Sequence, residues 1–96
     1  MSILTVLELQ TADGKADEAI AVLKKTLGDT RARPGCEGVT VHRDAAQPNA
    51  ILLVERWASL ADDEAYRAWR AGDGAVTEMA GLVVGLTIRY FDDVDA

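Results

Sequence analysis

Cysteine and histidine are scarce in this 96-residue chain. Cys36 is the only cysteine, so the chain has no internal disulfide, and His42 is the only histidine, so it cannot build a histidine-rich metal site. The sequence therefore argues against a zinc or non-haem iron site, and we expect no bound cofactor.

Basic residues and long apolar segments are scarce as well. Ten lysines and arginines against sixteen acidic residues give a net charge of -6, which argues against nucleic acids and anionic membranes as partners. Even the longest apolar runs, such as residues 82–86, are far shorter than the ~20 residues that span a bilayer. Residues 1–20 carry acidic groups where a signal peptide has a basic end. We therefore expect a cytoplasmic protein that binds neither nucleic acid nor membrane.

What the chain does contain is an ordered series of strand and helix patterns. Alternating or continuous apolar residues predict strands over residues 2–9, 39–42, 51–57 and 83–91. Helical spacing predicts helices over residues 15–33 and from Ser59 onward, with a short third helix over residues 75–80. The order strand, helix, strand, strand, helix, strand predicts one α+β domain over residues 1–96, of the ferredoxin-like kind with an antiparallel sheet.

The stretch from Ala50 to Gly72 contains three of the five aromatic residues of the chain together with three arginines. Its strand ends in Trp57, and Ser59 with the acidic residues 62–64 predicts a helix start, because a hydroxyl oxygen and carboxylates favour a helix N-terminus. The stripe that we expect this helix to bury consists of Ala61, Ala65, Ala68 and Trp69, with Tyr66 at its flank.

The strands predict a sheet that is apolar on both faces. In the third strand, Ile51 and Leu53 lie on one side and Leu52 and Val54 on the other, because side chains alternate along a strand. The helices of a ferredoxin-like domain cover only one face, so the other face needs a partner. Because two-fold homodimers are the commonest oligomers, we expect two copies to pack sheet to sheet.

Three short motifs in this chain occur in the order and spacing of a known family. They are Arg33-Pro34-Gly35-Cys36 at the end of the first helix, Glu55-Arg56-Trp57 at the end of the third strand, and Ser59 followed by Ala65-Tyr66 in the second helix. From Leu4 to Phe91 the chain resembles the antibiotic biosynthesis monooxygenase family, whose members are small dimeric α/β barrels. The resemblance implies a cofactor-independent monooxygenase that oxidises a quinol, an anthrone or a related electron-rich phenol with molecular oxygen.

The chain departs from many of these relatives at one position. They carry a histidine on the second helix where counting from Trp57 gives Tyr66 here. Acid–base exchange near neutral pH is harder for a phenol, with an unperturbed pKa of about 10, than for a histidine. Haem-degrading relatives use an asparagine on the first strand, whereas this chain has Thr5, Leu7 and Glu8 there and no asparagine. Haem degradation is therefore disfavoured.

Three aromatic side chains are candidates to hold a small aromatic substrate. Trp57 and Trp69 would wall a cleft between the second helix and the sheet, in which a flat ring could stack. Tyr66 would donate a hydrogen bond to a substrate oxygen. The alternative for the two tryptophans is ordinary core packing, and for Tyr66 a place at the rim of the core.

Three further candidates would handle protons and charge. His42 has the only side chain whose reference pKa suits a general base at pH 7, and Glu55 is the alternative base. Arg70 would stabilise the substrate anion. Structural interpretations stay open for each: an edge position in water for His42, an ion pair across the dimer interface for Glu55, and a solvated surface position for Arg70. We take His42, Tyr66 and Arg70 as catalytic candidates and Trp57, Trp69 and Glu55 as substrate-binding candidates.

Two other functions are compatible with the same residues. The first is a non-catalytic dimeric module that binds a small aromatic compound or serves in a stress response, which the missing helix histidine favours. The second is isomerase or decarboxylase chemistry on a muconolactone-like acid, for which Arg70 would have to face the cavity. The fold alone does not decide among the three.

Overall fold

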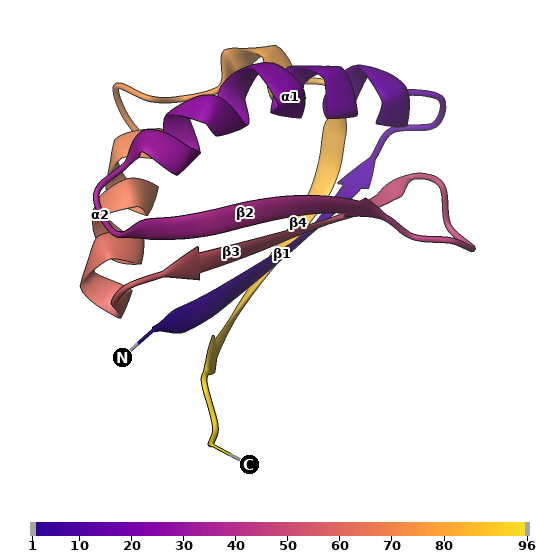
Figure 1. Cartoon of the computed structure of the whole chain (residues 1–96). Coiled ribbons are helices and arrows are strands. Elements are labelled where there is room, and N and C mark those ends of the chain that lie inside the picture. The colour runs from indigo at the N-terminus through magenta and orange to yellow at the C-terminus, as the bar shows by residue number, and fades with distance from the viewer. Residues whose placement is uncertain (1, 96) are drawn as a thin grey trace.

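The computed structural model describes residues 2–95 of the chain. Its elements follow the predicted order of an α+β, ferredoxin-like domain, and a single 3-10 turn takes the place of the predicted short third helix (Figure 1). They are β1 (Ile3–Thr11), α1 (Ala16–Ala32), β2 (Cys36–Arg43), β3 (Ala50–Trp57), α2 (Leu60–Arg70), η1 (Thr77–Met79) and β4 (Val83–Asp92). The fold predicted from the sequence is therefore confirmed.

The four strands form one antiparallel sheet in the order β2-β3-β1-β4, and the helices lie on one side of it (Figure 1). The register places Thr5 of β1 opposite Glu55 of β3 and Tyr90 of β4. Leu7 in the same way lies opposite Leu53. Because directly opposed residues share a face, these side chains all point toward the helix layer.

The core beneath the helices has two parts of different chemistry. The larger is aliphatic and is centred on Leu7, Leu23, Leu27 and Ile51, from β1, α1 and β3. The smaller consists of Ile3, Trp57 and Tyr66, with Trp69 packed against it. The first lies against α1 and the second against α2, so the character of the core changes from aliphatic to aromatic along the sheet.

The buried side of α2 differs from the predicted alanine stripe. Ala61, Ala65 and Ala68 are exposed, whereas Asp63 and Tyr66 are buried. The cause is that Asp63 finds a hydrogen-bond donor in the sheet, so the polar and aromatic side of α2 turns inward and the alanines face water. The predicted start of the helix is confirmed, since the Ser59 Oγ accepts a hydrogen bond of 3.2 Å from the Asp62 backbone N–H.

Two glycines explain where the observed boundaries differ from the predicted ones. Gly35 has a φ of +84°, and this turn lets β2 begin at Cys36 rather than at residue 39. The helix predicted over residues 75–80 is only the single 3-10 turn η1. Gly74 precedes it, and a Cβ atom there would overlap the Trp69 ring. The segment after α2 is therefore shaped by its contact with Trp69.

The sheet leaves apolar side chains uncovered on both of its faces. Leu4, Val6, Leu52 and Val54 lie half-buried on the face away from the helices. On the helix side, β4 extends past the helix layer, and Leu86, Ile88 and Tyr90 are 54%, 36% and 47% exposed. Among residues 2–95, no helix is both long and apolar enough to cross a bilayer.

Candidate active site

A cavity of about 150 Å³ lies between the helices and the sheet. Its polar lining consists of Thr26, Glu55, Tyr66, Arg67 and Arg70. Its apolar lining consists of Leu7, Leu9, Leu23, Leu27, Leu53, Val76 and Met79. The cavity therefore lies where the aliphatic part of the core meets the charged side of α2, and three of the candidate residues, Glu55, Tyr66 and Arg70, line it together.

Glu55 belongs to a buried network of charged and polar groups. Its carboxylate forms an ion pair with Arg67, and its Oε1 also accepts a hydrogen bond of 3.1 Å from the Trp57 indole Nε1–H. Arg67 reaches Asp63 as well, with 3.2 Å between Nη2 and Oδ2. The Thr5 hydroxyl donates a hydrogen bond of 2.7 Å to Asp63 Oδ2. One guanidinium thus bridges two carboxylates that are almost completely shielded from water.

Arg67 is a permanent cation in this network. Burial lowers the pKa of Arg67, but the facing carboxylates of Glu55 and Asp63 outweigh burial and raise that pKa above its usual value. Within residues 2–95, the Nε of Arg67 and the Oδ1 of Asp63 are buried without a hydrogen-bond partner. Arg67 can therefore stabilise negative charge, but it cannot exchange protons near neutral pH.

Arg70 fixes the position of Tyr66 at the same end of the cavity. Its Nε donates a hydrogen bond of 2.8 Å to the Tyr66 Oη, and its Nη2 donates to the Thr26 carbonyl and the Thr30 hydroxyl, each at 3.0 Å. The Tyr66 and Thr30 hydroxyls are 2.7 Å apart, and Arg70 Nη1 donates to the Gly74 carbonyl. Arg70 is therefore not a solvated surface residue, because it joins α1, α2 and the segment before η1.

The two tryptophans lie behind Tyr66 and do not line the cavity. Trp57 is fully buried, with its ring centroid 4.9 Å from that of Tyr66. Trp69 lies 6.1 Å from Tyr66, and the guanidinium carbons of Arg33 and Arg70 are each 4.6 Å from its ring. Both tryptophans are placed to orient Tyr66. Stacking of a substrate directly on them stays a prediction, and this geometry does not favour it.

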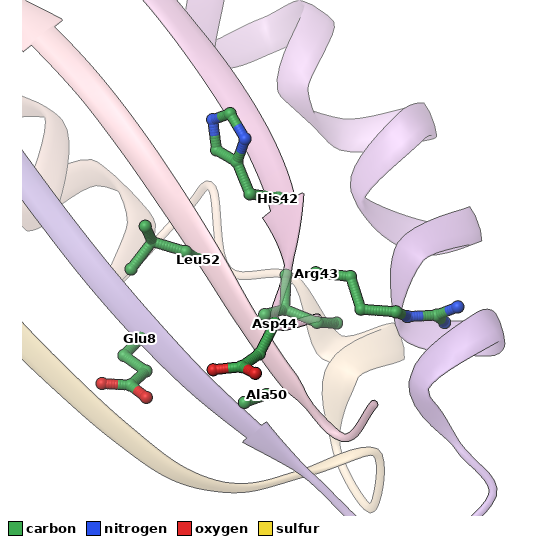
Figure 2. A pocket seen from close by; sticks show the side chains of 7 residues that line it. Glu8, His42, Arg43, Asp44, Ala50 and Leu52 are labelled. Carbon is green, nitrogen blue, oxygen red and sulfur yellow. The ribbon is translucent and has the colours of Figure 1, made fainter. Parts of the chain in front are cut away.

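His42 lies on the opposite face of the sheet from this cavity. In the register of β2 and β3, Val39 faces Glu55 and His42 faces Leu52, so His42 and Glu55 point to opposite sides. Figure 2 shows His42 pointing away from α1, on the same side as Leu52, whereas Arg43 points toward α1. The His42 ring is exposed, with Nε2 2.9 Å from the Thr40 hydroxyl. Among residues 2–95, Glu55 is the carboxylate that lines the cavity.

Four residues of the network were not predicted from the sequence to belong to the functional site. They are Thr5, Thr30, Asp63 and Arg67. A pattern that could have identified part of it is the spacing of Asp63, Tyr66, Arg67 and Arg70, at i, i+3, i+4 and i+7 of one helix. The two threonines carried no such pattern. Within the described part of the chain, no three histidine, cysteine or acidic side chains are grouped as they would be to hold a metal ion.

Residues 2–77 match the model of the antibiotic biosynthesis monooxygenase family. The chain belongs to this family. The match runs from β1 to the first residue of η1 and so includes every polar residue that lines the cavity. The resemblance inferred from the three sequence motifs is thus confirmed.

Solved structures of other proteins show the same fold. SnoaB of Streptomyces nogalater, a cofactor-independent oxygenase, has a TM-score of 0.83 and 16% identity, over 99% of this chain and 95% of SnoaB. A conserved protein of Methanosarcina mazei has a TM-score of 0.82 and 15% identity, over 95% of this chain and 91% of the other. A comparison of this chain with curated protein sequences found no match. At such identities the likeness establishes the fold and leaves the substrate open.

Proposed function

We propose that this antibiotic biosynthesis monooxygenase family member oxidises an electron-rich phenol, such as a quinol or an anthrone, with molecular oxygen and without a bound cofactor. The observation that carries the proposal is the cavity beneath the helices, in which Glu55, Tyr66, Arg67 and Arg70 line one polar end of an otherwise aliphatic space. The family membership and the likeness to a cofactor-independent oxygenase support it.

In the proposed reaction the substrate itself reduces oxygen. Glu55 accepts the phenol proton, and the electron-rich phenolate then transfers electrons to O₂. Overall the substrate loses two hydrogen atoms and gains one oxygen atom, while the second oxygen atom leaves as water, so all four electrons come from the substrate. Arg67 and Arg70 stabilise the negative charge that passes from the ring to oxygen, in a site where burial strengthens electrostatic interactions.

The neighbouring groups hold these residues in place. Trp57 donates its hydrogen bond to one oxygen of Glu55, and among residues 2–95 the other oxygen of Glu55 accepts none, so it is available to a substrate hydroxyl. Tyr66 is oriented by Arg70 and Thr30 and lines the same cavity as Glu55. A rigid arrangement of this kind favours catalysis because the reacting groups need little reorganisation.

The test is oxygen uptake by the metal-free protein with a panel of quinols, anthrones and simple phenols. We expect Glu55→Gln to lower the rate by about 100-fold or more, since a positioned base contributes that much. Tyr66→Phe should lower it less, and His42→Ala should leave it unchanged, because His42 lies on the other face of the sheet. Uptake no faster than uncatalysed autoxidation for every compound would contradict the proposal.

A non-catalytic binding module is the second candidate function. The observation that favours it is that the described cavity lining contains no histidine, so proton transfer near neutral pH depends on Glu55 alone. A phenol that raises the melting temperature of the protein but is never oxidised would decide for this function.

We further propose that the protein is a homodimer that packs through the sheet face away from the helices. Leu4, Val6, Leu52 and Val54 support this arrangement, because they place aliphatic side chains side by side on that face. Burying a few hundred Å² of such surface would contribute several kcal/mol, at about 25 cal/mol per Å². The partner would also cover His42, which lies on the same face as Leu52.

A further inference from the structure

The cavity size limits the number of rings that a substrate can have. Its volume is about 150 Å³. An aliphatic cavity of roughly 150 Å³ in another protein binds a single benzene molecule. The space beneath α1 and α2 is therefore large enough for one six-membered ring with small substituents, and fused ring systems of two or three rings would extend out of it into the adjoining groove.

The cavity polarity limits where the substrate can carry its oxygens. Glu55 lies opposite Thr5 of β1, whereas Leu9 lies four residues further along the same strand. Four residues of strand span roughly 13 Å, so the acidic end and the end at Leu9 are well separated. Tyr66, Arg67 and Arg70 all come from α2, on the side of Glu55. Hydrogen-bonding groups are therefore gathered at one end, and the far end is aliphatic.

This one-sided arrangement distinguishes between dihydroxybenzenes. When the two hydroxyls occupy adjacent ring carbons, both can face Glu55, Tyr66 and the arginines. When they occupy opposite carbons, one of them must enter the aliphatic end among Leu9, Leu23 and Met79, where a buried hydroxyl without a partner is unfavourable.

The charge around the cavity disfavours an ionised substituent. Two carboxylates, Glu55 and Asp63, balance the two guanidinium groups at the polar end. A groove that shares Thr26, Arg70 and Val76 with the cavity is also lined by Asp29, Asp73 and Glu78. With a net charge of -6 for the whole chain, an anionic substituent would be repelled at the outer side.

This inference rests on the proposed function and narrows its range of electron-rich phenols, setting para-quinols and anthrones aside. We propose that the substrate is a single-ring catechol with a small uncharged substituent. The substituent occupies the aliphatic end, and the adjacent hydroxyls face Glu55. In the reaction, one ring C–H bond is replaced by a C–O bond to an oxygen atom from O₂, and the product is a hydroxylated ortho-quinone. The catechol loses two hydrogen atoms overall, and these leave with the second oxygen atom as water.

The test compares binding without oxygen and turnover with it. Calorimetric titrations under anaerobic conditions use 4-methylcatechol, methylhydroquinone, 3,4-dihydroxybenzoate and a two-ring naphthohydroquinone. We expect 4-methylcatechol to bind about tenfold more tightly than methylhydroquinone, as one unsatisfied buried hydroxyl would cause. Equal or tighter binding of methylhydroquinone, the carboxylated compound or the two-ring compound would overturn the inference.

Cavity variants provide the matched control. Met79→Ala enlarges the aliphatic end and should allow the two-ring compound to bind, whereas the volume-conserving Met79→Leu should not. Both proteins are compared by thermal melting to verify folding. Tight anaerobic binding of 4-methylcatechol without oxygen uptake would contradict the monooxygenase function but support the ligand class. Oxygen uptake with anthrone in preference to catechols would support the monooxygenase function but contradict the ligand class.

Discussion

Glu55 is a carboxylate that could not lie in this core without its partners. It is 1% exposed and has Arg67 and the Trp57 indole as its two described hydrogen-bond donors. A buried charge costs several kcal/mol unless it is paired, so the position of Glu55 beside an aliphatic cavity depends on Arg67. The residue that we propose as the base is therefore maintained by a cation that belongs to a different element.

The first prediction concerns the loss of that cation. Arg67→Met leaves Glu55 and Asp63 buried without a counter-ion and should lower the free energy of unfolding by about 3–5 kcal/mol. Arg67→Lys is the control, since it keeps the positive charge and should lower the free energy of unfolding by less. Urea unfolding measures both. Stability of Arg67→Met within experimental error of the original protein would contradict the pairing described here.

The pKa of Arg67 also predicts how this pairing depends on pH. Because that pKa is raised in the folded protein, the stabilisation by Arg67 is fully present below its unfolded-state pKa and is lost only as the pH rises through the raised value. The contribution of this cation should thus be constant from neutral to mildly alkaline solution, and the stability difference between Arg67→Met and the original protein should not shrink over that range.

At the residue scale, the chemical character of the candidate side chains was predictable from the sequence, but the face of the sheet to which each side chain points was not. Glu55, Tyr66 and Arg70 were selected because they combine acid, phenol and cation within one strand and helix, and all three line the cavity. His42 was selected because of its reference pKa. The face of the sheet on which His42 lies depends on the register between β2 and β3, which is irregular near Gly38. Alternation along a single strand does not reveal that register.

Among the elements, α2 determines the character of the site. A helix usually buries its apolar stripe, and the alanines predicted that stripe. The sheet instead offers Thr5 as a donor to Asp63, and α1 offers Thr30 as a partner to Tyr66. These contacts are between residues far apart in the sequence, so the rotation of α2 could not be predicted from its own pattern. Its start at Ser59 could, because capping is local.

The second prediction concerns the segment that follows α2. Any Cβ at Gly74 would overlap the Trp69 ring, whereas a Cβ at Gly72 would meet only the Ala68 carbonyl at 3.7 Å, an ordinary contact. Gly74→Ala should therefore lower stability by about 1–3 kcal/mol, as overpacking does, and Gly72→Ala should change it little. Thermal melting of the two variants provides the comparison. Equal melting temperatures would contradict the described packing of Trp69.

For the whole molecule, the order of elements and the antiparallel sheet were predictable because each strand and helix has its own local pattern. The exposure of the apolar side chains of β4 was not predicted. Leu86, Ile88 and Tyr90 lie on the same face of the sheet as the helices, but the helices do not cover them. A single copy thus leaves aliphatic and aromatic surface exposed at that edge of the sheet, in addition to the open face.

The third prediction tests the proposed homodimer. Val54 lies between Val6 and Thr40 in the register of the sheet, near the middle of the open face. Val54→Asp should convert a dimer into a monomer, because it would place a charge in the interface of each copy. Leu60→Asp is the control, since Leu60 lies exposed at the start of α2. Sedimentation velocity measures both, and a monomeric original protein at micromolar concentration would contradict the dimer.

If the cavity beneath α1 and α2 performs oxygenation, the new oxygen atom of the product comes from O₂, and isotope labelling reveals its origin. The metal-free protein is incubated with the phenol that it oxidises fastest under ¹⁸O₂, and the product is analysed by mass spectrometry. We expect one labelled oxygen atom in each product molecule, and we expect Glu55→Gln to form the labelled product much more slowly. A product whose new oxygen comes from water, or a rate that Glu55→Gln leaves unchanged, would contradict oxygenation by this cavity.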